Sequence, residues 1–248
     1  MTHRVAIMQP YLFPYMGYFQ LIAAVDTFVL YDDVQFMSPG WINRNRILVN
    51  AQAQMFTLPV KSAHLAQRIN ERVFASNFSF EKAKFLRKIA HSYSRAPFYK
   101  TVLPLIERIL ACTDNNVARF IEHSVRTLCE YLHIETPILI SSELAIDTGE
   151  GAQSRVIAIV KRVGGDVYIN PYGGIDLYDP VVFAQNGIAL NFLRMDDVQY
   201  RQYGDAFVPF LSIIDVLMFN LPTDVREILT HYSLETPTSL RLESNHDQ

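Results

Sequence analysis

Two aspartates and two arginines in the first fifth of the chain are the side chains best suited to chemistry. Asp32 and Asp33 follow one apolar segment, and Arg44 and Arg46 alternate along the next. If the second segment is extended, both arginines project from one face, where two guanidinium groups form a fork for phosphate or carboxylate. An aspartate beside the bound anion would act as general base toward an amine or hydroxyl. Because neighbours on an extended chain point to opposite faces, we expect at most one aspartate to face the site.

The residues that we assign to catalysis are Asp32, Asp33 and Gln35. In one variant of this hypothesis, a Mg²⁺ ion bridges an aspartate and a substrate phosphate. In the structural alternative, the two aspartates cap a strand end and form ion pairs with Arg44 or Arg46. The histidines lack metal-ligand spacing and no Ser-His-Asp or Cys-His arrangement can be read, so we assign no resident metal and no such nucleophile.

A second group of candidates lies near the N-terminus. The apolar run Val5 to Met8 stops at Gln9-Pro10, and proline cannot donate to a sheet ladder, so a buried strand is expected to end at Gln9. An aromatic loop follows, and then helical spacing begins. Strand, loop and helix open an α/β domain, in which ligands bind beyond the carboxyl ends of strands. The substrate-binding candidates here are Gln9, Tyr11, Tyr15, Gly17 and Tyr18. Tyrosines stack on sugars or bases, and packing of the first helix onto the sheet is the structural alternative.

The other binding candidates come from three later segments. Residues 167–170 form a later predicted strand, the glycine-rich loop that follows it is a second candidate site loop, and 200–203 are a polar, aromatic loop. We expect these segments and the arginine strand to line the same cleft, through Asn43, Arg44, Arg46, Asn170, Gly173, Gly174, Tyr178 and Gln202. Asp215 stands in an apolar helical segment, so its burial demands a partner. We assign it a structural role, with Arg44, Arg46 or a backbone amide as the partner.

Hydrophobic periodicity predicts an α/β fold with a mostly parallel sheet, a β-hairpin and a helical insert. Expected strands are 4–9, 27–31, 41–49, 56–60, 137–142, 167–170 and 188–193. Expected helices are 15–25, 80–95, 97–112, 117–132, 154–162, 181–185, 210–219 and 222–232. We divide the chain into an α/β core (1–77 and 136–234), a helical insert (78–135) that covers one side of the sheet, and a frayed polar tail (235–248).

Composition restricts the classes of partner. Half of the 248 residues are hydrophobic, which suffices for a sizeable core, and the net charge of −3 gives no electrostatic reason to expect nucleic acid. Cys112 and Cys129 lie in apolar helical segments, as expected of a reduced cytoplasmic protein. We expect neither a signal sequence nor a membrane span, because no apolar stretch is long enough.

Several motifs together resemble the WbqC-like protein family. They are Gln9-Pro10-Tyr11-x-Phe13-Pro14-Tyr15-x-Gly17-Tyr18-Phe19, Tyr31-Asp32-Asp33-Val34-Gln35, Trp41-x-Asn43-Arg44-Asn45-Arg46, Tyr168-Ile169-Asn170-Pro171-x-Gly173-Gly174 and Leu211-Ser212-Ile213-Ile214-Asp215. Such proteins resemble products of bacterial surface-polysaccharide (O-antigen) clusters. The resemblance implies a transferase that adds a glycyl or other acyl group to a sugar or nucleotide sugar.

A weaker resemblance is to Rossmann-like nucleotidylyltransferase enzymes, which carry a His-x-Gly-His element after the first strand. The matching residues here are Tyr15-Met16-Gly17-Tyr18, so the glycine is kept and both histidines are replaced. A nucleotide-shaped pocket is implied, but neutral phenols lack the charge that adenylyl transfer needs. Two alternatives to the transferase therefore stand: a nucleotide-dependent ligase or nucleotidyltransferase, and a non-catalytic protein that binds sugar nucleotides.

Overall fold

The main sheet, in a computed structural model that describes residues 2–146 and 151–237, has the strand order β5-β2-β1-β6-β7-β8. Its strands are β1 (Arg4–Met8), β2 (Thr27–Leu30), β5 (Ile138–Ile140), β6 (Val167–Pro171), β7 (Ala189–Met195) and β8 (Tyr232–Glu235). Every neighbouring pair is parallel except β7 and β8. The predicted α/β fold with a mostly parallel sheet is confirmed.

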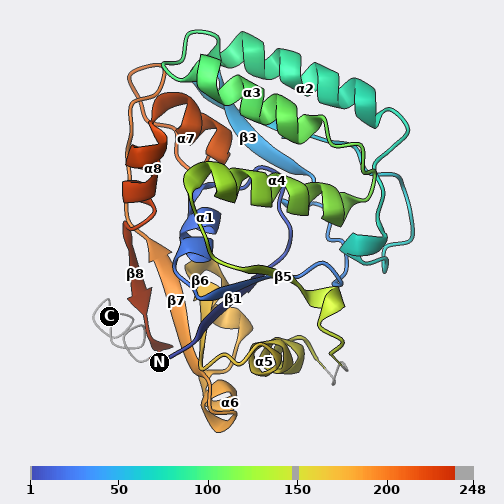
Figure 1. Cartoon of the computed structure of the whole chain (residues 1–248), viewed down its shortest axis with the longest axis vertical. Helices are drawn as coiled ribbons and strands as arrows, with labels where there is room; N and C mark the ends of the chain where they lie inside the picture. Colours follow the sequence, from blue (N-terminus) through green and yellow to red (C-terminus); the bar gives the residue numbers. More distant parts are fainter. Residues whose placement is uncertain (1, 147–150, 238–248) are drawn as a thin grey trace.

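Alternating side chains of the central strands feed two separate hydrophobic cores. Val5 and Ile7 join the core formed with α5 (Ala152–Arg162) and α6 (Pro180–Gln185). Ala6 joins the opposite core, which contains α1 (Met16–Ala23), α4 (Val117–Leu132) and α8 (Pro222–Ile228). Because both faces are covered, as Figure 1 shows, β1 and β2 are apolar without interruption after their first residues, Arg4 and Thr27.

The direction of strand addition reverses at β1. The chain runs from β1 to β2 and then β5 on one side, and later adds β6 and β7 on the other. The connections that leave β1 and β6 therefore diverge at their carboxyl ends. This is the position at which ligands bind in open α/β sheets.

A second layer lies beyond α1 and α4. It comprises the hairpin β3 (Arg44–Val49) and β4 (Gln52–Thr57), with α2 (Phe78–Tyr93), α3 (Tyr99–Leu110) and α7 (Ile213–Phe219) (Figure 1). Phe85 of α2 stacks on Phe56 of β4, with ring centroids 4.2 Å apart, and contacts Phe13 of the first loop at 5.8 Å. These residues belong to the same buried cluster as α1 and α4. The boundaries at 78 and 135 stay a prediction.

Two predicted strand boundaries in the hairpin are wrong. The first strand begins at Arg44 instead of residue 41, and its partner is 52–57 instead of 56–60. The partner shifts because the turn needs only Asn50 and Ala51, which adopt φ angles of 50° and 59°. Two positive φ angles in succession are typical of the tight turn whose twist matches the hairpin.

Two boundaries near the C-terminus are also wrong. The helix expected from 210 begins at Ile213, because the Ser212 hydroxyl caps it by accepting from the amide of Ile214 at 3.3 Å. The helix expected to reach 232 ends at Ile228, and Tyr232–Glu235 forms the antiparallel strand β8. Most of the predicted tail, from residue 238, lies outside the described residues.

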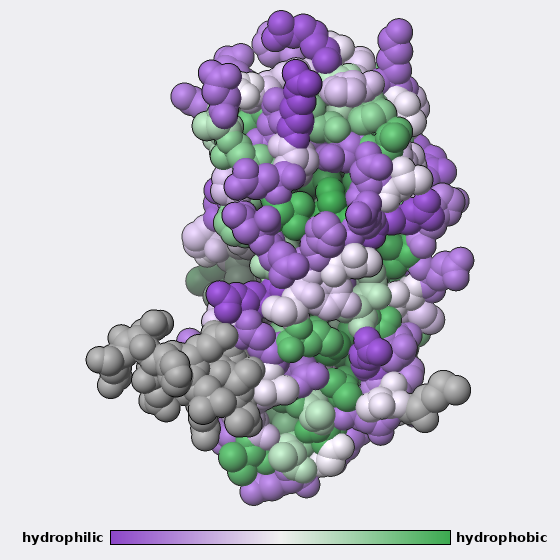
Figure 2. All heavy atoms as spheres, turned by 90° about the vertical axis from the view of Figure 1, so that its left-hand side faces the viewer, coloured by the Kyte–Doolittle hydropathy of each residue, from purple (hydrophilic) through white to green (hydrophobic). Residues whose placement is uncertain are grey.

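The remaining elements are three short 3₁₀ turns, η1 (Ile69–Glu71), η2 (Ser141–Glu143) and η3 (Tyr172–Leu177). The surface formed by β8 and α8 is mixed, with apolar residues exposed between polar ones (Figure 2). Within the ranges that the structure describes, no helix is both long and apolar enough to cross a membrane.

We predict that Ala51→Gly raises the free energy of unfolding by about 0.5–1 kcal/mol, because glycine adopts a positive φ angle without the steric cost of a Cβ. Urea denaturation would measure the change. The control is Ala53→Gly, on the adjoining strand and equally exposed, which should lower stability. A loss of stability in both variants would contradict the role assigned to the turn.

Candidate functional site

A hollow of about 640 Å³ opens where β1 and β6 end, at the reversal of strand order. We call it the sheet-end chamber. Its size is in the range of small-molecule sites. The structure brings together these predicted binding residues in its lining: Gln9, Tyr11, Tyr15, Arg46, Asn170, Gly173, Gly174 and Tyr178. Residues that we did not predict also line it: Ile7, Met8, Pro14, Tyr31, Trp41, Asn45, Pro171, Leu177 and Phe210.

Four tyrosines give the chamber aromatic faces and neutral hydroxyls. Burial raises the pKa of Tyr15, and that of Tyr11 with a smaller contribution from Tyr15. Burial also raises the pKa of Tyr178, and raises that of Tyr31 to about 12 although the Arg155 guanidinium opposes the shift. These phenols therefore stay protonated at neutral pH, when they can donate hydrogen bonds and stack on a ring.

Arg46 supplies the cationic group of the lining. Its guanidinium lies 5.5 Å from the centroid of the Trp41 ring, and its Nη2 donates to the carbonyl of Phe210 at 3.3 Å. Its Nε is buried and has no hydrogen-bond partner among the described residues. A buried donor without a partner is costly, so an anionic ligand oxygen would be stabilising here.

Arg44 does not join Arg46 in a fork over the chamber. Its Nε donates to the carbonyl of Gly40 at 2.8 Å, and it is absent from the chamber lining. The strand register does place both arginines on one face, half-buried, with Asn45 buried between them. Asn45 uses its amide to hold the aromatic loop, donating to the carbonyls of Leu12 and Phe13.

The glycine-rich loop after β6 is shaped by Asn170. The Asn170 side chain accepts from the Tyr168 hydroxyl and donates to the carbonyl of Gly174, both at 3.1 Å. A Cβ on Gly174 would overlap the Asn170 amide, so a larger residue would displace that amide from its contact with the Gly174 carbonyl. A Cβ on Gly173 would meet nothing within 4 Å, which leaves this part of the backbone open to a ligand.

Gly17 and Tyr18, the two candidates at the start of α1, contact residues that line the chamber but do not line it themselves. A Cβ on Gly17 would lie 2.5 Å from Cε2 of Tyr15, so glycine lets the Tyr15 ring fold over the helix. Tyr18 is fully buried, and its hydroxyl donates to the carbonyl of Gln9 at 3.0 Å. Its ring packs 5.7 Å from that of Tyr11. Tyr18 thus supports the lining without reaching the chamber.

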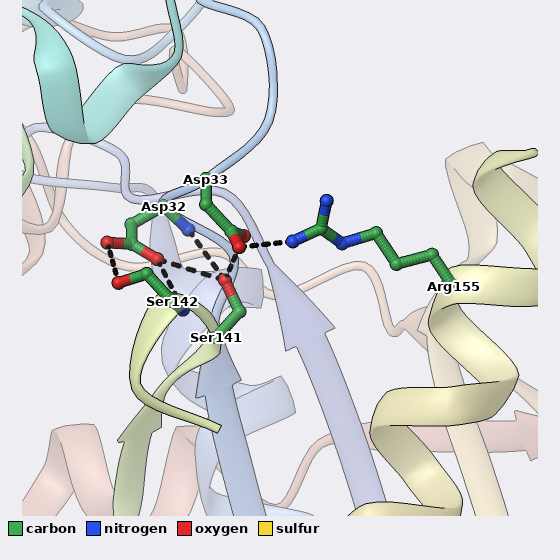
Figure 3. A network of polar contacts seen from close by, with 5 residues as sticks. All are labelled: Asp32, Asp33, Ser141, Ser142 and Arg155. Carbon is green, nitrogen blue, oxygen red and sulfur yellow. Dashed lines mark hydrogen bonds and ion pairs between the residues drawn. The ribbon is translucent and has the colours of Figure 1, made fainter. Parts of the chain in front are cut away.

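Asp32 and Asp33 both turn toward η2, directly after β5, where they contact Ser141 (Figure 3). Asp32 accepts from the Ser141 hydroxyl at 2.9 Å, and from the amide and hydroxyl of Ser142 at 3.0 and 2.7 Å. Asp33 accepts from the Ser141 hydroxyl at 2.5 Å and forms an ion pair with Arg155 of α5. The chain bends once β2 ends, so the extended backbone that we assumed for the two aspartates is wrong and both carboxylates reach Ser141. Neither aspartate lines the chamber, which is compatible with the expectation that at most one faces it.

The ion-pair partner that we considered for these aspartates is also wrong. The cation is Arg155, instead of Arg44 or Arg46. Arg155 lies with its guanidinium 5.4 Å from the ring centroid of Tyr31, which lines the sheet-end chamber. Asp32 instead lines a separate hollow of about 250 Å³. The aspartates therefore support the chamber from its edge and do not line it.

The other candidates are engaged outside the chamber lining. The side-chain amide of Gln35 donates to the Leu65 carbonyl at 3.0 Å, and that of Asn43 to the Leu58 carbonyl at 2.8 Å. Gln202 donates to Asp215 at 2.7 Å. Across the described part of the chain, no group of three or more His, Cys, Asp or Glu residues is arranged to hold a metal ion.

Asp215 is fully buried and accepts three hydrogen bonds. The donors are the hydroxyls of Tyr93 and Tyr200, both at 2.8 Å, and the Gln202 amide at 2.7 Å. The expected partners, Arg44, Arg46 or a backbone amide, were wrong. Burial raises the pKa of Asp215, and the three donors oppose that shift. Because the Tyr93 hydroxyl also accepts from the amide of Leu48, this network joins α7, α2 and the strand that carries Arg46.

Sequence reasoning missed the residues that act through long-range contacts. Ser141 and Ser142 follow a short apolar strand, which is the signal that could have paired them with the aspartates after β2. Tyr31 could have been found as the last residue of the predicted strand 27–31. Arg155 and Phe210 had no local signal, since their partners are more than one hundred residues away.

We predict that Asp215→Ala lowers the free energy of unfolding by about 3 kcal/mol, because it leaves buried donors unsatisfied. Denaturant titration would measure the loss, with Asp205→Ala, at an exposed aspartate, as the near-neutral control. Equal stability of the two variants would show that the buried network contributes nothing.

Comparison of wild type with Asp215→Ala also tests the raised pKa of Asp215. A raised pKa in the folded state means that the protonated carboxyl is the better tolerated form. The contribution of Asp215 to stability is largest at a pH below 3.8, the ordinary pKa of an aspartate, and falls as the pH rises through the pKa in the folded state. We expect the stability difference between wild type and Asp215→Ala to shrink from about pH 4 to pH 7. A difference that grows with pH would contradict the direction of the shift.

Comparison with known proteins gives two matches of nearly full length. A family profile described as the WbqC-like protein family matches residues 9–227. A protein of Mycobacterium tuberculosis (strain ATCC 25618 / H37Rv), named "Uncharacterized protein Rv1507c", is 28% identical over 231 residues, which cover 92% of this chain and 98% of the relative. No solved structure matches the chain significantly.

Proposed function

The chain belongs to the WbqC-like protein family, and from that premise we propose that it is a transferase of bacterial surface-polysaccharide (O-antigen) synthesis. In this proposal it attaches a glycyl or other acyl group to a sugar, bound as a nucleotide sugar in the sheet-end chamber. The observation that carries the proposal is the lining of that chamber. It combines aromatic faces, neutral hydroxyl donors and one guanidinium with a donor unsatisfied by the described residues.

Each part of a nucleotide sugar has a complementary part of the chamber. A phosphate oxygen suits the free Nε–H of Arg46, since a charge-assisted hydrogen bond would satisfy a buried donor. Sugar or base rings suit the faces of Tyr11, Tyr15 and Tyr178. The open backbone at Gly173 allows close approach of the ligand. The site lies where the strand order reverses, the usual place for nucleotides in such sheets.

The chamber favours an amine as the group that attacks the acyl donor. Among the described lining residues, the ionisable side chains are tyrosines and Arg46, so no carboxylate is at hand to act as base. An amine is nucleophilic once neutral, whereas a hydroxyl needs a base to remove its proton. We therefore propose an amino sugar as acceptor. Tyr31 would donate to the oxygen on which charge develops, because its raised pKa keeps its proton in place.

Asp32 and Asp33 enter this proposal as positioning residues. Asp33 fixes Arg155, and Arg155 stacks on Tyr31. Asp32 ties the segment after β2 to the serines after β5. A Mg²⁺ ion at Asp32, on a phosphate, would need that carboxylate to give up its present donors.

Two other functions would use the same chamber. A nucleotide-dependent ligase or nucleotidyltransferase is favoured by the position at the strand reversal. Because Tyr18 is buried and Tyr15 is neutral, Arg46 would be the cation that stabilises the charge of a transferred phosphate. A non-catalytic protein that binds sugar nucleotides would need only the lining. Binding and turnover, measured separately, distinguish the three.

We predict that UDP-linked amino sugars bind to the protein in calorimetric titrations, and that Arg46→Gln weakens the affinity about tenfold by removing a charge-assisted contact. Arg44→Gln is the matched control, since Arg44 lies two residues away on the same strand face but outside the chamber lining. Equal effects of the two substitutions would reject the assigned phosphate contact.

The transfer itself is tested by mass spectrometry of the sugar after incubation with a glycyl thioester. A product heavier by one glycyl group supports the transferase. Tight binding without product across a panel of acyl donors favours the non-catalytic alternative. Binding of ATP with Mg²⁺ in place of the nucleotide sugars favours the ligase.

A further inference from the structure

A second hollow, of about 610 Å³, lies along β7, β8 and α7 beside the sheet-end chamber. We call it the side chamber. Tyr15 and Phe210 line both chambers. The same two residues line a smaller hollow of about 220 Å³, which Gly173 shares with the sheet-end chamber and Arg194 with the side chamber. The three hollows therefore adjoin one another around Tyr15 and Phe210.

The lining of the side chamber differs in chemistry from that of the first. Its walls are largely apolar, with Met16, Met195, Val198, Phe207 and Leu211 among them. Charged residues are Arg194, Asp196, Asp197 and Glu235. Figure 2 views the side of the molecule that carries β8 and α8, where exposed apolar residues are interspersed with polar ones. Such a lining suits an aliphatic group better than a sugar.

Glu235 offers one specific polar contact in this chamber. Its side chain is 11% exposed, and its Oε1 pairs with Arg194 at 3.1 Å. Its Oε2 is buried and has no partner among residues 2–146 and 151–237. A buried carboxylate oxygen without a donor is costly, and an N–H group of a ligand would remove that cost.

Phe210 is held at the junction in a strained conformation. Its φ angle of 55° is unfavourable for a bulky residue, yet the residue is 59% exposed. The neighbouring segment is fixed by hydrogen bonds from the Ser212 amide to the Arg46 carbonyl at 2.8 Å and from the Ser212 hydroxyl to the Phe13 carbonyl at 2.7 Å. An exposed aromatic ring kept in place at such a cost is typical of a ligand contact.

We propose that the side chamber binds the acyl donor, a thioester carried on an aliphatic amide-containing arm, and that its acyl group meets the amino sugar between Tyr15 and Phe210. This inference rests on the proposed transferase function. In the reaction, the acyl carbon–sulfur bond breaks and a carbon–nitrogen bond forms. The proton lost by the amine goes to the departing thiolate, so the products are an amide and a thiol, and no further reactant is needed.

The test uses the full chain and S-hexanoyl-N-acetylcysteamine, a soluble thioester with an aliphatic chain and one amide N–H. Ligand-detected NMR titration gives its affinity. Val198→Trp should weaken binding of this probe by about tenfold, because the indole takes up part of the chamber, while binding of the UDP-linked amino sugar stays the same. Val181→Trp, on the exposed surface of α6, is the matched control and should change neither affinity.

The outcomes separate this inference from the function on which it rests. Thioester binding that is absent, or that survives Val198→Trp, overturns the side-chamber assignment even when the nucleotide sugar binds normally. Failure of the nucleotide sugar to bind overturns the proposed function instead. If Val198→Trp does not fold by circular dichroism, Val198→Phe takes its place in the same comparison.

Discussion

The reversal of strand order at β1 is the constraint on which the rest of the site depends. Because β2 adds on one side of β1 and β6 on the other, the loops that follow β1 and β6 separate instead of running together. The space between them must be closed by other parts of the chain. The hairpin closes it with Arg46, the segment before the hairpin with Trp41, and the segment before α7 with Phe210.

These walls are joined by buried polar groups more than by surface ion pairs. Asp215 unites α7 with Tyr93 of α2 and with the loop that carries Tyr200 and Gln202. The Asp33–Arg155 ion pair joins the segment after β2 to α5. Burying a carboxylate is costly, and good geometry with several donors offsets that cost. Such networks specify one arrangement, because each alternative leaves a buried group unsatisfied.

The sequence was sufficient for the parts that depend on local pattern. Apolar runs ended by Gln9-Pro10 and Asn170-Pro171 located the central strands, and the aromatic loop and glycine-rich loop pointed to the chamber that they line. It was insufficient where the partner is remote. The aspartates after β2 were expected to meet the nearby arginines, whereas the serines after β5 and Arg155 hold them. Strand β8 was missed because four residues carry too little periodicity.

The contact between Arg46 and Phe210 spans 164 positions of the chain, so an early and a late segment together complete the chamber. During synthesis the central strands β1 and β2 are made early, but the wall at Phe210 cannot exist until most of the polypeptide has left the ribosome. Until then, the first loop lacks the hydrogen bonds that its Phe13 and Pro14 carbonyls accept from Ser212 and Ile213. A shortened product that lacks the segment before α7 would have no wall at Phe210, and the hollow at the end of the sheet would be open on that side.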